Sequence, residues 1–114
     1  MTAIEVSDLL TTYNHKYITR SSLDYDYVYF SGKFTHTIST AAKNGMRAGL
    51  CRYDVWDDRF YPEFFMIFES GVPMKCENIA KDDFVDGIRY YGFVKNLYPI
   101  GTVSGNLYVV GTNR

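Results

Sequence analysis

The chain has 114 residues, of which 46% are hydrophobic and 18% aromatic, and its formal net charge is −1. Lys and Arg are scattered along it, which excludes the concentrated basic face that binding to duplex DNA requires. No apolar run approaches the roughly 20 residues of a membrane-spanning helix. We therefore expect one soluble globular domain over residues 1–114, with no membrane partner.

The N-terminal residues have the pattern of an amphipathic helix. Thr2 and Glu5 fit a capping box, and apolar residues then recur at helical spacing, which predicts a helix over residues 3–13. The same residues lack the basic start and unbroken apolar stretch of a secretion signal, so we expect a cytoplasmic protein. In that compartment Cys51 and Cys76 are expected to be reduced thiols, buried in the core.

Residues 24–55 alternate with a period of two, which is typical of strands. Ser31-Gly32 predicts a tight turn, and Asn44-Gly45 is the strongest hairpin signal in the chain because both turn residues tolerate positive φ. The alternative is a short helix over residues 40–48, in which the central glycine would cost about 1 kcal/mol relative to Ala. The favoured hairpins predict three strands, at residues 24–30, 34–42 and 47–55.

The two turn registers independently place aromatic side chains on one face of this three-stranded meander. The expected cross-strand rows are Tyr29-Phe34-Val55, Tyr27-His36-Tyr53 and Tyr25-Ile38-Cys51. Because a one-sided sheet needs a cover, the first interpretation is that helices pack on this face. If the face is exposed instead, its rings would stack a nucleotide-like molecule or single-stranded nucleic acid. The ligand-stacking residues would then be Tyr25, Tyr27, Tyr29, His36 and Tyr53.

The second half of the chain is expected to add a strand, a helix and a final hairpin. Residues 63–69 are apolar on both faces, which favours a central strand. Residues 80–92 carry an apolar stripe at helical spacing. The hairpin would join residues 100–103 to 107–110 through a turn at 104–106. The predicted fold is a two-layer α+β domain, with an antiparallel sheet of five or six strands and two helices packed on one face.

The segment 52–61 is the first candidate for a functional surface. It contains the only Trp of the chain, and Trp, Tyr and Arg are the residue types most enriched at interface hot spots. The alternative is that the Trp side chain packs across the end of the sheet. The expected partner-binding residues are Arg52, Trp56, Asp57, Asp58, Arg59 and Tyr61. Three aspartates of the second predicted helix, Asp82, Asp83 and Asp86, would extend this surface.

No motif of the sequence predicts a catalytic, metal or cofactor site. His36 has no acid on its own face in the predicted register, and a general base needs such a partner. His and Cys lack the short paired spacing of zinc sites. An enzyme is therefore not favoured, and the form that it would take is a small hydrolase using His36 with Glu63 or Glu69.

The sequence thus predicts a small non-enzymatic binding protein that engages another protein and modulates or inhibits it. In general character, such small aromatic-rich chains are similar to accessory proteins of bacteriophages and other mobile elements, which often bind and block a host protein. The alternative function is a ligand-binding module that uses the tyrosine face for a nucleotide-like molecule or single-stranded nucleic acid. An exposed edge strand would also allow a homodimer.

Overall fold

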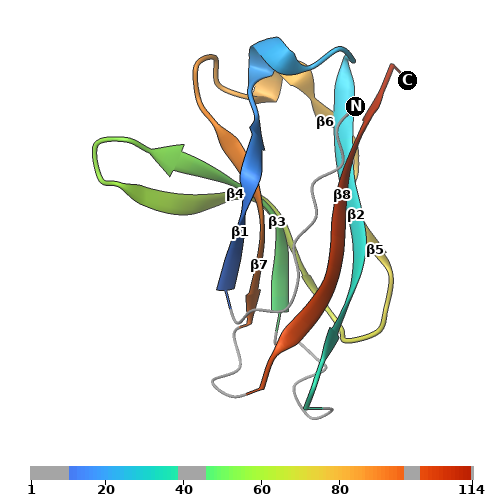
Figure 1. The fold of residues 1–114 in the computed structure, drawn as a ribbon. Coiled ribbons are helices and arrows are strands. Elements are labelled where there is room, and N and C mark those ends of the chain that lie inside the picture. Colours follow the sequence, from blue (N-terminus) through green and yellow to red (C-terminus); the bar gives the residue numbers. More distant parts are fainter. Residues whose placement is uncertain (1–10, 39–45, 97–100, 114) are drawn as a thin grey trace.

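The computed structural model describes residues 11–38, 46–96 and 101–113, with side chains described from Tyr17 onward. In these ranges the chain forms two antiparallel sheets of four strands and two single-turn 3-10 helices, η1 (Arg20–Ser22) and η3 (Lys81–Asp83). Figure 1 shows the sheets as two facing layers. No helix in the described ranges is long and apolar enough to cross a membrane. The expected α+β class is therefore wrong, and the fold is all-β.

The first sheet has the strand order β1-β7-β3-β4. Its strands are β1 (Thr11–Ile18), β3 (Met46–Asp54), β4 (Arg59–Phe68) and β7 (Tyr90–Asn96). β3 and β4 form a hairpin in which Asp54 pairs with Arg59 beside the turn. Figure 1 shows the turn end of this hairpin projecting away from the two layers as an arm.

The second sheet is built around β2 (Tyr27–His36). One edge of β2 pairs along its whole length with β8 (Val103–Thr112). The other edge pairs with two short strands, β5 (Met74–Lys75) and β6 (Ile79–Ala80). Both short strands lie in this sheet, and residues 81–89 then carry the chain from β6 to β7 in the first sheet.

The core lies between the two sheets and follows the period of two expected for strands. On β2 the buried side chains include Val28, Phe30 and Phe34, and on β3 they include Met46, Ala48 and Leu50. Burying a large apolar side chain contributes roughly 1.5–3 kcal/mol. The two inner faces therefore supply the main driving force that holds the layers together.

The predicted helix over residues 80–92 is wrong, and Gly87 supplies the physical reason. Its φ of 82° lies in the left-handed region, which a right-handed helix does not contain. Phe84 and Tyr90 are both buried, and their rings meet edge to face with centroids 4.9 Å apart. The segment therefore forms η3, a turn at Asp86-Gly87 and the first residues of β7.

The predicted meander is also wrong. Ser31-Gly32 lies inside β2, where Gly32 permits close packing, because a Cβ at this position would clash with the carbonyl oxygen of Asn106 on β8. β2 and β3 belong to different sheets, so none of the three predicted cross-strand rows forms. The Asn44-Gly45 turn lies outside the described residues. The third predicted strand is confirmed, since β3 occupies almost the same residues.

Three further predictions are corrected. The strand predicted to be central is β4, which lies at the edge of its sheet and pairs with β3 alone among the described strands. Pro62 suits that edge because it cannot donate a backbone hydrogen bond. The predicted C-terminal hairpin is the single strand β8, since it pairs with β2 throughout. Of the predicted helix over residues 3–13, residues 11–13 belong to β1 and the rest lies outside the described ranges.

Candidate functional site

The turn at residues 55–58 closes the projecting arm, and Asp54 fixes its shape. Oδ1 of Asp54 accepts hydrogen bonds from the backbone N–H groups of Asp57 at 3.0 Å and Trp56 at 2.9 Å. These bonds hold the pKa of the Asp54 carboxyl below its ordinary value, and the bond from Asp57 has the largest effect. Asp58 takes a positive φ of 52°, a conformation that Asp adopts more readily than most residues.

Two tyrosines hold the other aspartates of the turn. The Tyr53 hydroxyl donates to Oδ1 of Asp58 at 2.5 Å, and the Tyr61 hydroxyl donates to Oδ2 of Asp57 at 2.5 Å. Because each bond needs a protonated phenol, each raises the pKa of its tyrosine. The turn is thus connected by side chains to both strands of the arm.

Arg52 binds within the arm. Its Nη1 lies 3.5 Å from Oδ2 of Asp54, and its Nε lies 3.6 Å from Oε2 of Glu63. Its guanidinium also lies 4.8 Å from the centroid of the Tyr61 ring. Partly exposed ion pairs of this kind each contribute about 0–1 kcal/mol. Arg52 therefore acts as an internal brace of the arm, and its predicted role as a direct partner contact stays a prediction.

The apolar residues at the tip are open to solvent. Trp56 is 93% exposed and Val55 is 70% exposed, and Arg59 beside the turn is exposed as well. The alternative interpretation of Trp56, in which its ring packs across the end of the sheet, is therefore wrong. A large exposed ring on an ordered turn is a feature of interaction surfaces.

A run of four rings anchors the base of the arm. Neighbouring ring centroids lie 5.2 Å apart for Tyr53 and Phe60, 5.3 Å for Phe60 and Tyr91, and 5.5 Å for Tyr91 and Tyr17. The Arg89 guanidinium lies 4.9 Å from the centroid of the Tyr17 ring. The run crosses all four strands of the first sheet, so the base of the arm packs against β7 and β1 of the sandwich.

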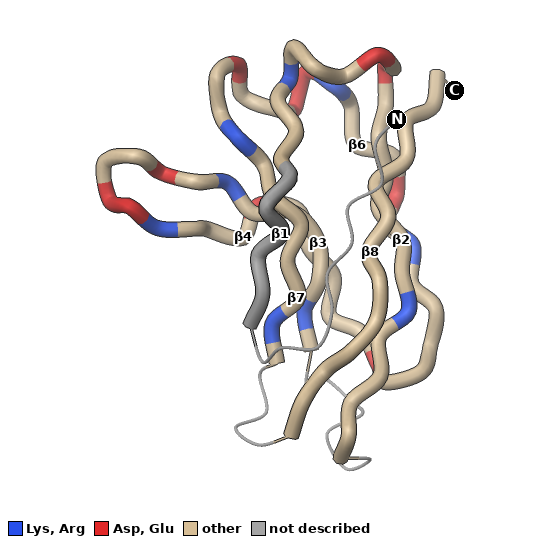
Figure 2. The backbone as a smooth tube through the Cα atoms, in the orientation of Figure 1, with Lys and Arg blue, Asp and Glu red and all other residues tan. Residues whose placement is uncertain are grey.

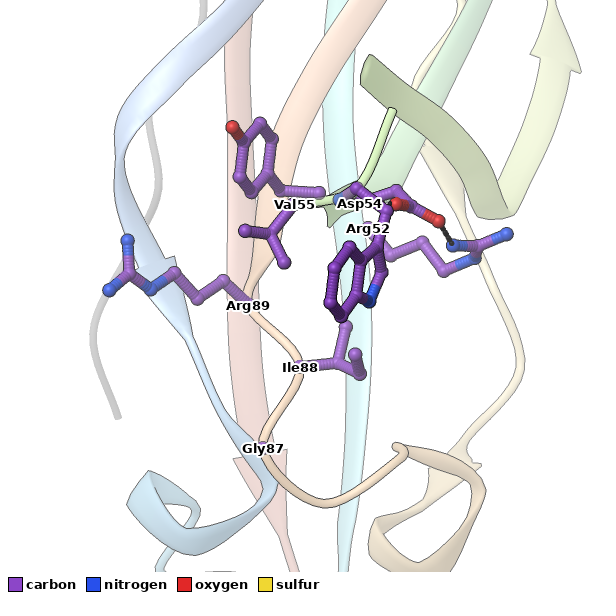
Figure 3. Close-up of a pocket in the computed structure, with 8 residues that line it drawn as sticks. Arg52, Asp54, Val55, Gly87, Ile88 and Arg89 are labelled. Carbon is purple, nitrogen blue, oxygen red and sulfur yellow. Dashed lines mark hydrogen bonds and ion pairs between the residues drawn. The ribbon is translucent and has the colours of Figure 1, made fainter. Parts of the chain in front are cut away.

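A pocket of about 330 Å³ lies between the arm and the loop before β7. The arm supplies Arg52, Tyr53, Asp54, Val55 and Trp56, and the loop supplies Gly87, Ile88 and Arg89. The Tyr53 N–H donates to the Arg89 carbonyl oxygen at 3.1 Å, which joins the two walls. Figure 3 shows the guanidinium groups of Arg52 and Arg89 pointing away from the pocket in opposite directions, with Val55 and Ile88 between them.

The three predicted acidic residues lie in the chain segment that leads into the pocket wall, although the predicted α-helix does not form. Asp82 and Asp83 belong to η3, and Asp86 directly precedes Gly87 in the pocket wall. Asp82 pairs with Arg20 at 2.8 Å, and all three carboxylates are exposed. Figure 2 shows acidic positions along both the arm and this loop. The helix predicted around these charges is wrong, and their predicted part in partner binding stays a prediction.

The structure does not bring the predicted ligand-stacking residues together. Tyr27 and Tyr29 alternate along β2 with buried residues and lie on its outer side, where Lys75 Nζ is 4.4 Å from the Tyr29 ring centroid. Tyr25 lies against Gly111 at the edge of the same sheet. His36 is itself one of the buried residues of β2, and Tyr53 belongs to the other sheet. A shared platform of all five side chains is therefore not formed.

His36 is only 8% exposed and lies in a hydrogen-bonded junction. Its Nε2 lies 3.0 Å from Oδ1 of Asn96, and its Nδ1 accepts a hydrogen bond from the Ile38 N–H at 2.9 Å. A general base must reach its substrate, and this imidazole instead connects β2 to β7. We therefore do not propose the hydrolase. Within the described ranges, no three His, Cys, Asp or Glu side chains gather as metal ligands would.

Comparisons of the chain with models of protein families, with curated proteins and with solved structures gave no match.

Proposed function

We propose that this chain is a non-enzymatic binding protein that engages another protein through the tip of the β3–β4 arm. The observation that carries the proposal is the 93% exposure of Trp56 on a turn held by hydrogen bonds to Asp54, Asp57 and Asp58. An indole in this position contributes nothing to the core. It is available to a partner as a large contact surface.

The order of the turn supports the proposal energetically. Binding costs free energy whenever a loop must become ordered, at about 0.5–1.5 kcal/mol for each immobilised side chain. In this arm, hydrogen bonds from Tyr53 and Tyr61 already hold Asp58 and Asp57. The arm therefore presents Trp56 on a backbone whose conformation is set before the partner arrives.

Inhibition is the form of modulation that we propose. A narrow arm with an aromatic tip suits a concave surface on the partner, and concave surfaces are where proteins bind their ligands. An arm seated there would exclude those ligands. This mode of action needs no chemistry from the chain itself.

Affinity capture from an extract of the producing cells tests the proposal. Wild type, Trp56→Ala and Arg59→Ala would serve as baits. Ile67→Ala is the matched control, because Ile67 is an exposed apolar residue near the end of β4 that is distant from the tip. We expect the Trp56 variant to lose at least about 30-fold in affinity for the captured protein, the value for a hot spot of about 2 kcal/mol. The Ile67→Ala control should keep the wild-type affinity for the captured protein.

The melting temperatures of the variants decide how that result is interpreted. Because the Trp56 ring is exposed, its removal should leave the melting temperature nearly unchanged. A captured protein that binds wild type and Trp56→Ala equally well would contradict the proposal. A large fall in melting temperature would show that the indole belongs to the folded core instead.

A further inference from the structure

The surroundings of Trp56 indicate which kind of protein segment the tip would bind, and this inference rests on the proposed function. Val55 and Ile88 give the pocket an apolar interior, and the guanidinium groups of Arg52 and Arg89 are directed outward from it (Figure 3). A pocket of about 330 Å³ is at the lower end of the range for small ligands. Its size therefore suits one inserted side chain.

Apolar exposure continues from the arm onto the loop before β7. Val85 is 55% exposed and lies two residues before Gly87 of the pocket wall. Val55 and Trp56 on the arm and Val85 on the loop are thus exposed apolar residues of the two separate segments that wall the pocket. The Tyr53–Arg89 backbone hydrogen bond fixes these segments relative to each other, so the pocket is formed before any partner binds.

The charges around this surface are predominantly acidic. The two segments, residues 52–59 and 82–89, contain six aspartates and three arginines. Arg52 pairs with Asp54, Asp82 pairs with Arg20, and Arg89 lies over the Tyr17 ring with its charge retained. The charges of the two segments outside these ion pairs are four aspartates and two arginines. Asp83 and Asp86 are exposed in the loop segment that leads into Gly87 of the pocket wall, which we call the rim, so they add negative charge beside the approach to the pocket.

We propose that the pocket between the arm and the β7 loop binds a basic segment of the partner protein. One large apolar side chain of that segment enters the pocket beside Trp56 and Ile88. Lys or Arg residues next to it pair with Asp83 and Asp86 at the rim. The apolar contact supplies most of the affinity, and the charges supply steering and orientation.

A displayed library of random linear peptides tests this inference. Peptides would be selected on wild type and counter-selected on Trp56→Ala. The expected products carry one aromatic or branched apolar residue flanked by Lys or Arg. Their affinity for wild type should fall roughly tenfold or more when salt rises from about 0.05 M to about 0.5 M, because rim charges are screened.

Charge variants then assign the salt effect to the rim. The double variant Asp83→Asn/Asp86→Asn should weaken binding and flatten the salt dependence. Glu77→Gln is the matched control, since Glu77 is an exposed acid located between β5 and β6 of the other sheet. The salt titration uses wild-type protein alone, so it reports on the inference even if a variant folds poorly.

The outcomes separate this inference from the proposed function. Peptides that depend on Trp56 but are acidic, or bind equally well at all salt concentrations, would overturn the basic partner and leave the tip as the binding surface. Peptides that bind the Trp56→Ala protein equally well would overturn both. Failure to enrich any peptide would overturn the peptide pocket, and the capture experiment would then decide the proposed function on its own.

Discussion

The Tyr61 hydroxyl on β4 donates a hydrogen bond of 2.5 Å to Oδ2 of Asp57 in the turn of the arm. Tyr53 on β3 makes the equivalent bond to Asp58. Each strand of the hairpin therefore holds one aspartate of the turn, and Trp56 lies directly before these two residues. The order of the exposed tip depends on side chains set back along the strands.

Alkaline titration tests this arrangement directly. The pKa values of Tyr53 and Tyr61 are raised, mainly because their hydroxyls donate to Asp58 and Asp57. A raised phenol pKa means that the two bonds are intact below the ordinary value near 10. They are lost as pH rises through the higher folded values, so the turn loosens in that window.

Each Tyr→Phe variant, at position 53 or 61, should lose one late-titrating phenol when absorbance is followed against pH. The fluorescence anisotropy of Trp56 should also be lower in the variants at neutral pH, because one of the two tyrosine hydrogen bonds to the turn is absent. If each variant instead loses a phenol that titrates near the ordinary tyrosine pKa, the result would contradict the two hydrogen bonds.

Acid should loosen the same turn through Asp54. Its carboxyl pKa is lowered, mainly because the carboxylate accepts a hydrogen bond from the Asp57 N–H. The charged carboxylate therefore stabilises the turn at pH values above its ordinary pKa, and this stabilisation is lost as pH falls through the lower pKa of the folded protein. Trp56 anisotropy should then fall at the acid end of the titration. Asp54→Asn keeps an acceptor oxygen without the charge, so it should preserve the turn at neutral pH and remove this acid transition.

Asp54→Ala should remove the turn's order at every pH. If the alanine and asparagine variants show the same Trp56 anisotropy as wild type throughout, the Asp54 carboxylate does not fix the turn.

Local patterns predicted part of this site from the sequence, because the tip is built from consecutive residues. The concentration of rings and charges at 52–61 identified Trp56 as a surface residue, and the alternation around it identified β3. The opposite wall of the pocket was not predictable in this way. Gly87, Ile88 and Arg89 reach Trp56 only because β7 pairs with β3, a contact between distant segments.

The fold failed to follow from the sequence for a related reason. Gly32, predicted to form a tight turn, instead allows β8 to approach β2, and Gly87, which falls inside a predicted helix, turns the chain into β7. The apolar spacing of residues 84–91 fits a helix, yet Phe84 and Tyr90 reach the same core from a 3-10 turn and a strand. Tertiary packing overrides local propensity at these positions.

Tyr90 should control the loop wall of the pocket. Its ring is buried, and its hydroxyl accepts a hydrogen bond from the Val85 N–H at 2.8 Å, which holds the loop against the core. Tyr90→Phe keeps the ring and removes this bond, so it should cost about 0.5–1.5 kcal/mol of unfolding free energy. Amide exchange at residues 85–89 should increase more than exchange in β2.

Phe84→Ala provides the contrasting case for Tyr90→Phe. It removes a fully buried ring from the core and should cost about 3–5 kcal/mol, with faster exchange in both sheets. If Tyr90→Phe also accelerates exchange in both sheets equally, the Tyr90 hydroxyl does not act locally on the pocket wall.

The two cysteines should react with thiol reagents in a fixed order. Both are free thiols, as the sequence predicted, but Cys51 is buried and Cys76 is half-buried. Burial raises the pKa of Cys51 to about 12 and also raises that of Cys76. Because the thiolate is the reactive form, Cys51 combines low access with a very small thiolate population at mildly alkaline pH.

Alkylation followed by mass spectrometry measures this order. In the folded protein Cys76 should be modified slowly and Cys51 only at the rate of global unfolding, whereas denaturant should make the two equal. Cys51 lies on β3 opposite Tyr91, and its thiol donates to the Tyr91 carbonyl oxygen at 3.4 Å. Modification of Cys51 before Cys76 in the native state would show that the ring run at the base of the arm opens on its own, and the arm could not then be a preordered binding element.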